Sequence, residues 1–293
     1  MKVVVTGGSG LIGEYVVDEL KKFHYEVTNF DIKEPKDKSV DFVKADMLKI
    51  GDCKKAFKGA EAVIHLAAVP NPYNDPPEKI MYVNIMGTTN VYVAASELGI
   101  KKVIHASTDS TYGFWYRKQD FLPYYLPLDE EHPLNTQDSY GLSKKIDEEI
   151  AANFARSHNM QTISVRIPFV FIRGTIMPLM IYYNITSYKA IVENPELLKD
   201  GLWAYCDVRD IAQAFRLMVE AKGLKKHEVF CICAEDNVTK IESVELVRKY
   251  WSERIPFKKE VKGRAPLMDY SKAKAMLGYK PRYTWRDAIN RIL

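Results

Sequence analysis

Short runs of β-branched and other apolar residues alternate along the chain with segments in which apolar positions recur at helical spacing. The first run, Val3 to Val5, suits a strand buried on both faces of a parallel sheet. Runs of this kind predict strands at residues 3–5, 26–31, 40–43, 62–68, 103–107, 161–166 and 229–234. Helices are predicted at residues 11–17, 51–58, 77–98, 138–158, 207–221, 238–251, 271–277 and 285–293. This alternation indicates an α/β fold built on a Rossmann-type doubly wound parallel sheet.

The pattern becomes less regular beyond residue 166. Residues 168–200 are rich in aromatic residues and methionine, and short helical stretches follow residue 235. We therefore expect a dinucleotide-binding Rossmann domain at residues 1–166, completed by residues 201–235. Residues 167–200 and 236–293 are expected to form a small C-terminal substrate-binding lobe. A chain of 293 residues can bury the large core that this arrangement needs.

A glycine-rich turn joins the first strand to the first helix. Gly7, Gly10 and Gly13 permit a tight turn, close approach of the backbone to a phosphate, and close packing of helix on strand. The helix N-terminus then offers free N–H groups to a pyrophosphate. Asp31 ends the second strand, where a carboxylate can accept hydrogen bonds from the adenosine ribose and would repel a 2′-phosphate. The pattern therefore predicts NAD rather than NADP.

Composition and charge narrow the choice of partners. The formal net charge is +4, with Lys and Arg scattered among Asp and Glu, which gives no case for binding nucleic acid or a membrane surface. No apolar run approaches the ~20 residues of a transmembrane helix, and the first strand begins directly after Met1. We therefore expect no signal peptide and a cytoplasmic location. Cys53, Cys206, Cys231 and Cys233 lack metal-ligand spacing, so we expect buried thiols and no metal site.

Two further motifs follow the glycine turn. Tyr140 and Lys144 are four residues apart, so they project from one face of a helix. Thr108 comes just past the end of a strand, where open α/β sheets place their ligands. Together, T-G-G-x-G-x-x-G, a Ser/Thr before x-x-x-Y-G, and Y-x-x-x-K resemble the extended short-chain dehydrogenase/reductase family. Within it, the set is similar to the NAD-dependent sugar epimerases and dehydratases, such as UDP-glucose 4-epimerase.

The resemblance covers nearly the whole chain and implies further roles. Asp46 falls where that family contacts adenine, residues 65–68 match a strand motif beneath the cofactor, and Asn84 usually helps hold that region together. The implied cofactor-binding residues are Gly7, Gly10, Leu11, Ile12, Gly13, Asp31, Asp46, Met47, Leu66, Ala67, Ala68, Asn84, Tyr140 and Lys144.

The resemblance also implies a catalytic set of Thr108, Tyr140 and Lys144. A phenol with a pKa of ~10 is a poor base at neutral pH, but Lys144 and the positive nicotinamide would favour the phenolate. Tyr140 would then take a proton from a sugar hydroxyl while the same carbon gives hydride to NAD⁺. Thr108 would hydrogen-bond the reacting oxygen, with Ser107 as a weaker competitor, and Lys144 would also bind the nicotinamide ribose.

The chain departs from the dehydratase pattern beside Thr108. Dehydratases carry Thr-Asp-Glu where this sequence has Thr108-Asp109-Ser110. Ser110 cannot act as the base that removes a proton next to a keto group, so elimination of water is disfavoured. Asp109 is either the acid of that pattern or a turn residue.

The expected substrate-binding residues are Ser107, Thr108, Arg173 and Arg264. Arg264 lies where the family often puts a diphosphate-binding arginine. Arg173 could grip a carboxylate bidentately, as an arginine appears to do in the uronate dehydrogenases. The usual Asn-x-Tyr-Gly-Pro pattern is missing from this part of the chain, at residues 168–173. For both arginines a solvated surface position is the alternative.

The resulting hypothesis is an NAD-dependent epimerase acting on a nucleotide sugar. The alternatives are a uronate or aldose dehydrogenase that releases NADH, and a non-catalytic dinucleotide-sensing protein. The resemblance also implies a homodimer formed through the helices at residues 77–98 and 138–158. An aromatic insertion at residues 114–125 either stacks on sugar faces and closes over the site or is a packed loop or dimer contact.

Overall fold

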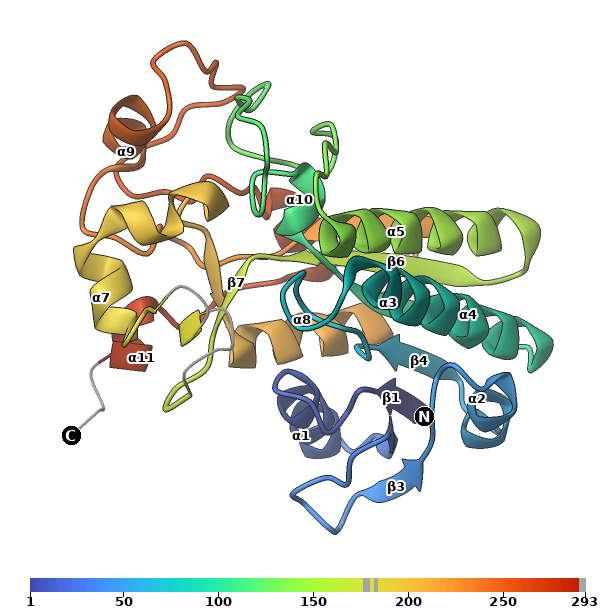
Figure 1. Ribbon diagram of the computed structural model, residues 1–293. Helices are drawn as coiled ribbons and strands as arrows, with labels where there is room; N and C mark the ends of the chain where they lie inside the picture. The colour runs from blue at the N-terminus through green and yellow to red at the C-terminus, as the bar shows by residue number, and fades with distance from the viewer. Residues whose placement is uncertain (176–179, 182–183, 290–293) are drawn as a thin grey trace.

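A parallel sheet organises the protein (Figure 1). The computed structural model describes residues 1–175, 180–181 and 184–289, and within them the main sheet has seven strands. These are β1 (Lys2–Thr6), β2 (Glu26–Asp31), β3 (Asp41–Lys44), β4 (Ala62–His65), β5 (Lys102–Thr108), β6 (Gln161–Ile167) and β9 (His227–Cys231). Their order is β3-β2-β1-β4-β5-β6-β9, and every pair is parallel. The predicted doubly wound α/β fold is confirmed, and the strand order reverses between β1 and β4, where such folds bind ligands.

Helices cover both faces of this sheet. On one face lie α1 (Gly13–Lys22), α8 (Val208–Glu220) and α10 (Ser271–Leu277); on the other lie α2 (Ile50–Ala56), α4 (Gly87–Glu97) and α5 (Ser139–Ser157). The helix predicted at residues 77–98 is formed by α3 (Pro77–Met81), a π-helical turn η1 (Tyr82–Met86) and α4. Val3 and Val5 pack against the first set of helices and Val4 against the second. This alternation explains why the strand is apolar at consecutive positions.

A second group of elements packs at one end of the sheet (left in Figure 1). It contains a two-stranded parallel sheet, β7 (Phe169–Phe171) and β8 (Tyr205–Asp207). Its helices are α7 (Tyr188–Glu193), η3 (Pro195–Gly201), α9 (Ser243–Tyr250) and α11 (Trp285–Ile289). A separate aromatic core joins them, with Trp203 and Phe171 fully buried. The domain boundaries proposed from the sequence stay a prediction.

One predicted helix begins later than expected. The pattern at residues 238–251 predicts a helix, but α9 starts at Ser243. Before it, the Asn237 side chain accepts hydrogen bonds from the backbone and hydroxyl of Thr239 and donates one to the Ile241 carbonyl. These side-chain bonds occupy backbone groups that a helix would use, and they hold a turn instead. In the last predicted helix, residues 290–293 lie outside the described part of the chain.

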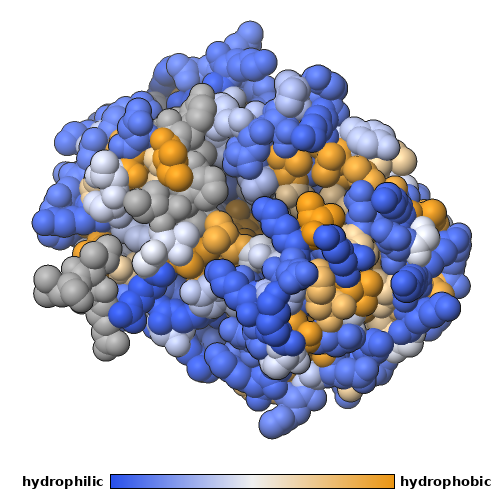
Figure 2. Space-filling view, turned by 60° about the horizontal axis from the view of Figure 1, so that its bottom comes forward, coloured by the Kyte–Doolittle hydropathy of each residue, from blue (hydrophilic) through white to orange (hydrophobic). Residues whose placement is uncertain are grey.

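The surface is mainly hydrophilic, with apolar side chains exposed in patches, some of them around the hollow near the middle of the face in Figure 2. Across residues 1–175, 180–181 and 184–289, no helix has the length and apolar character to cross a membrane.

A buried ion pair fixes α5 against the sheet. Arg166, on β6, donates through Nη2 to Glu148 Oε2 at 2.8 Å and through Nε to Oε1 at 3.0 Å. Ser107, on β5, donates to the same Oε1 at 2.6 Å. Glu148 therefore ties α5 to two strands at once. Since Tyr140 and Lys144 precede Glu148 by two turns and one turn, they share its helix face and point toward the end of β5.

We expect Arg166→Met to lower the free energy of unfolding by about 3–5 kcal/mol, because it leaves Glu148 buried without its cation. The double variant Glu148→Gln/Arg166→Met should recover part of that loss. Arg156→Met, on an exposed position of the same helix, is the control and should change stability by less than about 0.5 kcal/mol. Urea unfolding measures all three, and equal effects at Arg166 and Arg156 would contradict the assigned role.

Candidate active site

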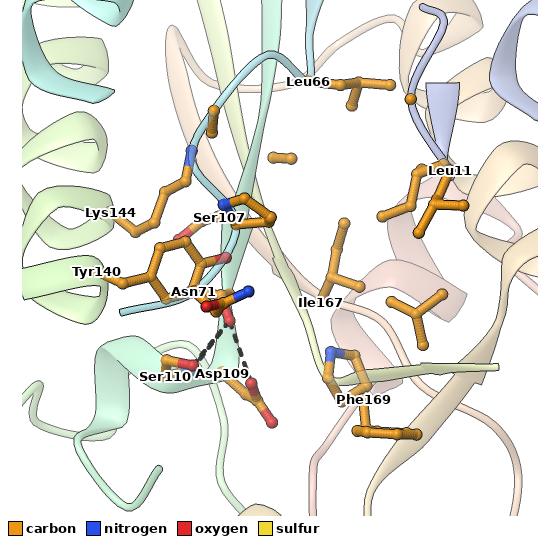
Figure 3. Close-up of a pocket in the computed structure, with 18 of the residues that line it drawn as sticks. Leu11, Leu66, Asn71, Ser107, Asp109, Ser110, Tyr140, Lys144, Ile167 and Phe169 are labelled. Atoms are coloured by element: carbon orange, nitrogen blue, oxygen red, sulfur yellow. Dashed lines mark hydrogen bonds between the residues drawn. The ribbon is translucent and has the colours of Figure 1, made fainter. Parts of the chain in front are cut away.

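A cavity of about 310 Å³ opens at the carboxyl ends of β1, β4 and β5. Eleven of the residues expected at the site line it: Gly7, Gly10, Leu11, Ile12, Gly13, Leu66, Ala68, Ser107, Thr108, Tyr140 and Lys144. Figure 3 shows Tyr140 and Lys144 reaching in from α5 on one side, opposite Leu11 of the glycine turn. Residues from the two ends of the predicted cofactor site and the predicted catalytic set therefore share one enclosure.

The glycine turn leaves room for a phosphate only because side chains are missing. Gly7 has φ of +72°, and a Cβ there would lie 2.6 Å from the backbone nitrogen of Ala67. A Cβ on Gly13 would lie 2.1 Å from the Gly7 carbonyl oxygen. Among the described residues, the backbone N–H groups of Leu11, Ile12 and Gly13 donate to no protein acceptor. Three unpaired donors at a helix N-terminus, beside an open cavity, fit a dinucleotide pyrophosphate.

Asp31 connects the glycine turn to the end of β2. Its Oδ2 accepts a hydrogen bond from the Ser9 backbone at 3.0 Å, and its Oδ1 accepts one from the Lys33 backbone at 2.9 Å. Each carboxylate oxygen keeps a second lone pair, so ribose hydroxyls can still be bound. Asp31 lies beyond the cavity lining itself, on the side where the adenosine half of a dinucleotide would extend.

Other expected cofactor residues lie behind the cavity wall. Asp46 accepts a hydrogen bond from the Leu48 backbone through Oδ1, and Met47 is buried against α4. Asn84 accepts from the Val69 backbone N–H at 2.8 Å and donates to Ser143 Oγ at 2.9 Å. Asn84 therefore links the loop after β4 to α5, and holds the wall rather than lining it.

Thr108 and Tyr140 meet at the end of β5. The Thr108 hydroxyl hydrogen-bonds the Tyr140 phenol, which lowers its pKa. Burial has the larger effect, and together with Asp109, Asp138 and Asp147 it raises the pKa of Tyr140 well above the ordinary value. The phenol is therefore protonated at neutral pH in the protein alone, and its ionisation needs a positive charge brought beside it.

The Lys144 ammonium has a carboxylate partner. Its Nζ lies 3.2 Å from Asp147 Oδ2, and both side chains are buried. Burial raises the pKa of Asp147 to about 6, and the charge of Lys144 lowers it. The sequence predicts a lysine acting on the phenol; the structure adds a carboxylate that divides that positive charge.

The family model of the NAD dependent epimerase/dehydratase family matches residues 3–233. The chain belongs to this family. NAD is the family's cofactor, in agreement with the glycine turn and Asp31.

Several relatives are recognisable by sequence. A putative UDP-glucose 4-epimerase of Methanocaldococcus jannaschii is 34% identical over 178 residues, which are 58% of this chain and 56% of that protein. An L-arabinose 1-dehydrogenase (NAD(P)(+)) of Haloferax volcanii is 31% identical over 171 residues, 57% of this chain and 66% of the relative. A uronate dehydrogenase of Pseudomonas syringae pv. tomato is 26% identical over 169 residues, 57% and 58% of the two chains. The match thus spans 56% to 66% of the lengths of these relatives.

Solved structures share the fold over nearly the full chain. MoeE5 in complex with UDP-glucuronic acid and NAD superposes with a TM-score of 0.74 at 20% identity, covering 99% of this chain and 97% of that one. UDP-glucose 4-epimerase of Thermotoga maritima superposes with a TM-score of 0.72 at 22% identity, covering 98% and 96%.

In this member of the family, the two arginines expected to bind substrate lie elsewhere. Arg173 is exposed. Arg264 pairs with Asp236 at 3.0 Å and donates to the Thr239 carbonyl at 3.0 Å. Neither lines the cavity, and of the residues described along its wall Lys144 is the single cationic one. Ser107 does line it, but its hydroxyl donates to Glu148.

The sequence did not assign several lining residues. They are Pro70, Asn71, Ala106, Asp109, Ser110, Trp115, Tyr116, Ile167, Pro168, Phe169 and Val170. The aromatic character of residues 114–125 was the one available signal for Trp115 and Tyr116. The others follow strand ends, but nothing in their identity distinguishes them from core residues.

Asp109 is a buried acid in this wall. It accepts hydrogen bonds from Trp115 Nε1 at 2.8 Å and from Thr108 Oγ1 at 3.2 Å. Burial raises the pKa of Asp109 to about 7, and these hydrogen bonds oppose the rise. The carboxyl is therefore partly protonated at neutral pH.

We expect Asp109 to make folding stability depend on pH. The folded pKa of about 7 exceeds the ordinary value of about 3.9, so the contribution is complete below about pH 4 and is lost as the pH rises through 7. Over this window the wild type should lose up to about 4 kcal/mol relative to Asp109→Asn. Urea unfolding at several pH values measures the difference, because Asp138, Asp147 and Asp210 titrate in both proteins. Parallel pH profiles would contradict the assignment.

Proposed function

We propose that this chain is an NAD-dependent enzyme that oxidises a hydroxyl-bearing carbon of a sugar. The observation that carries the proposal is that Thr108, Tyr140, Lys144 and the glycine turn line one cavity. Bound NAD⁺ supplies the acceptor for the hydride that leaves the carbon.

The side chains divide the remaining work. The Tyr140 oxygen takes the proton of the substrate hydroxyl, and the Thr108 hydroxyl holds that oxygen in line. Lys144 favours the phenolate by its charge and offers its remaining N–H groups to ribose hydroxyls. Asp147 keeps the buried ammonium compensated. The enclosing wall excludes water, which strengthens each of these interactions.

Elimination of water is not part of the proposal. Ser110 occupies the position at which the base of a dehydratase would stand, and its hydroxyl lies 3.2 Å from Thr108 Oγ1. A serine hydroxyl is far too weak a base to remove a proton next to a ketone.

Two endings of the oxidation separate the candidate functions. An epimerase of nucleotide sugars, favoured by the sequence and by the name of the 34% identical relative, would return the hydride to the other face. A dehydrogenase would release the oxidised sugar and NADH. We place the dehydrogenase first, because Arg173 and Arg264 lie away from the cavity and leave a nucleotide diphosphate without the expected cation.

A homodimer is also proposed, through α3, η1, α4 and α5. Tyr82, Met86 and Leu142 on these helices are 58%, 42% and 39% exposed, and a partner copy would cover such apolar side chains. The cytoplasmic location stays a prediction.

We expect Tyr140→Phe to lower kcat/KM for sugar oxidation by about 10²–10⁴-fold, because the proton acceptor is lost. The affinity for NAD, measured by calorimetry, should stay unchanged. Tyr82→Phe, an exposed tyrosine on another helix, is the matched control and should keep full activity. Wild-type rates in Tyr140→Phe would remove this phenol from the mechanism.

The ending of the reaction can be read from the absorbance at 340 nm. With NAD⁺ and aldoses or uronates, we expect NADH to accumulate in proportion to the sugar oxidised. Conversion of UDP-glucose to an epimer without net NADH would instead establish the epimerase. NAD binding with neither product would favour the dinucleotide-sensing alternative.

A further inference from the structure

The aromatic insertion at residues 114–125 forms part of the cavity wall. Trp115 and Tyr116 both line the cavity. The Trp115 indole N–H donates to Asp109 Oδ2 at 2.8 Å, and its ring stacks on Phe169 with centroids 6.5 Å apart. The start of the insertion is therefore packed into the site, as one of the two alternatives from the sequence has it, and it brings two aromatic rings with it.

Contacts with the small lobe hold the same segment from the other side. Arg117 donates to Asp200 at 2.7 Å and to the Phe114 carbonyl at 3.0 Å, and its guanidinium lies 4.7 Å from the centre of the Trp251 ring. Gly201 leaves the space that Trp115 fills, since a Cβ there would lie 2.3 Å from the indole. The segment is thus fixed at residue 115 and at residue 117.

Between these anchors, Tyr116 adopts a strained backbone. Its φ is +59°, in the left-handed region that a residue with a bulky side chain rarely occupies. Such strain persists only where the surroundings enforce it, and it concentrates at functional sites. Here it turns the Tyr116 ring toward the cavity, edge-to-face with Tyr73 at 5.3 Å.

Asp109 gives the same wall its electrostatic character. It is 8% exposed and lies beside Thr108 and Tyr140. The cation described along the wall, Lys144, is already paired with Asp147. A carboxylate or diphosphate on the substrate would therefore meet a buried acid with no free cation to compensate it.

We propose that Asp109, Trp115 and Tyr116 form a recognition wall that selects neutral sugars over uronates and nucleotide sugars. The aromatic side chains contact the apolar C–H face of the sugar ring. Asp109 hydrogen-bonds a hydroxyl next to the carbon that reacts at Tyr140. Neutral hydroxyls satisfy this carboxyl in either protonation state, whereas an anionic substituent is repelled whenever it is ionised. The proposal rests on the proposed sugar oxidation and names its substrate class.

The test compares purified wild-type protein on matched substrates with NAD⁺: galactose and arabinose, galacturonate, and UDP-glucose with product analysis for epimerisation. We expect kcat/KM for the better neutral aldose to exceed that for galacturonate by at least about tenfold. Equal or greater activity on galacturonate or UDP-glucose would overturn the recognition wall and leave sugar oxidation standing. No turnover of any sugar by protein that binds NAD would overturn both.

Variants assign the selectivity to the wall. Asp109→Asn keeps the size of the side chain and removes its charge, so the preference for aldose over galacturonate should fall about tenfold through a lower KM for galacturonate. Trp115→Phe removes the N–H that binds Asp109 and should shift the preference in the same direction by less, which keeps the test valid if Asp109→Asn fails to fold. Asp18→Asn, on the exposed side of α1, is the matched control. An unchanged preference in a folded Asp109→Asn would remove Asp109 from recognition.

Discussion

The position of α5 depends on one buried charged interaction, between Glu148 and Arg166. Burying both ions is unfavourable, and their attraction offsets that cost only because the geometry is bidentate and Ser107 adds a further hydrogen bond. What the pair supplies is position. Tyr140 and Lys144 stand on the same helix face at one-turn intervals, so anchoring Glu148 to β5 and β6 sets where both side chains enter the cavity.

The fold can be predicted from this sequence because its signals are local. Strands buried on both faces require consecutive apolar residues, as at Val3 to Val5, and helices carry their own ends. Asp138 accepts a hydrogen bond from the Gly141 backbone at 2.8 Å, and α5 begins at the next residue. By contrast, β7 and β8 have three residues each. Strands that short show no periodicity, so the second sheet could not be predicted.

The cavity contains predictable and unpredictable parts for the same reason. Gly7, Tyr140 and Thr108 belong to motifs whose geometry follows from the elements around them. The pairing of Lys144 with Asp147 and the direction of the insertion depend on contacts between side chains. Arg117 and Asp200, for example, are separated by 83 positions, and no spacing in the sequence announces that they meet. Arg264 shows the converse, because an ion pair with Asp236 holds a residue that pattern alone would place at a ligand.

The anchored segment from residue 114 to residue 117 separates two demands that proteins often have to satisfy with the same residues. Its fixing contacts come from side chains outside the seven hydrogen-bonded strands, so its sequence can drift without disturbing the sheet. Such a segment behaves as an exchangeable cassette on a constant chassis. New substrate preferences can therefore arise in this lineage by replacing a few consecutive codons, while the machinery for hydride transfer stays untouched.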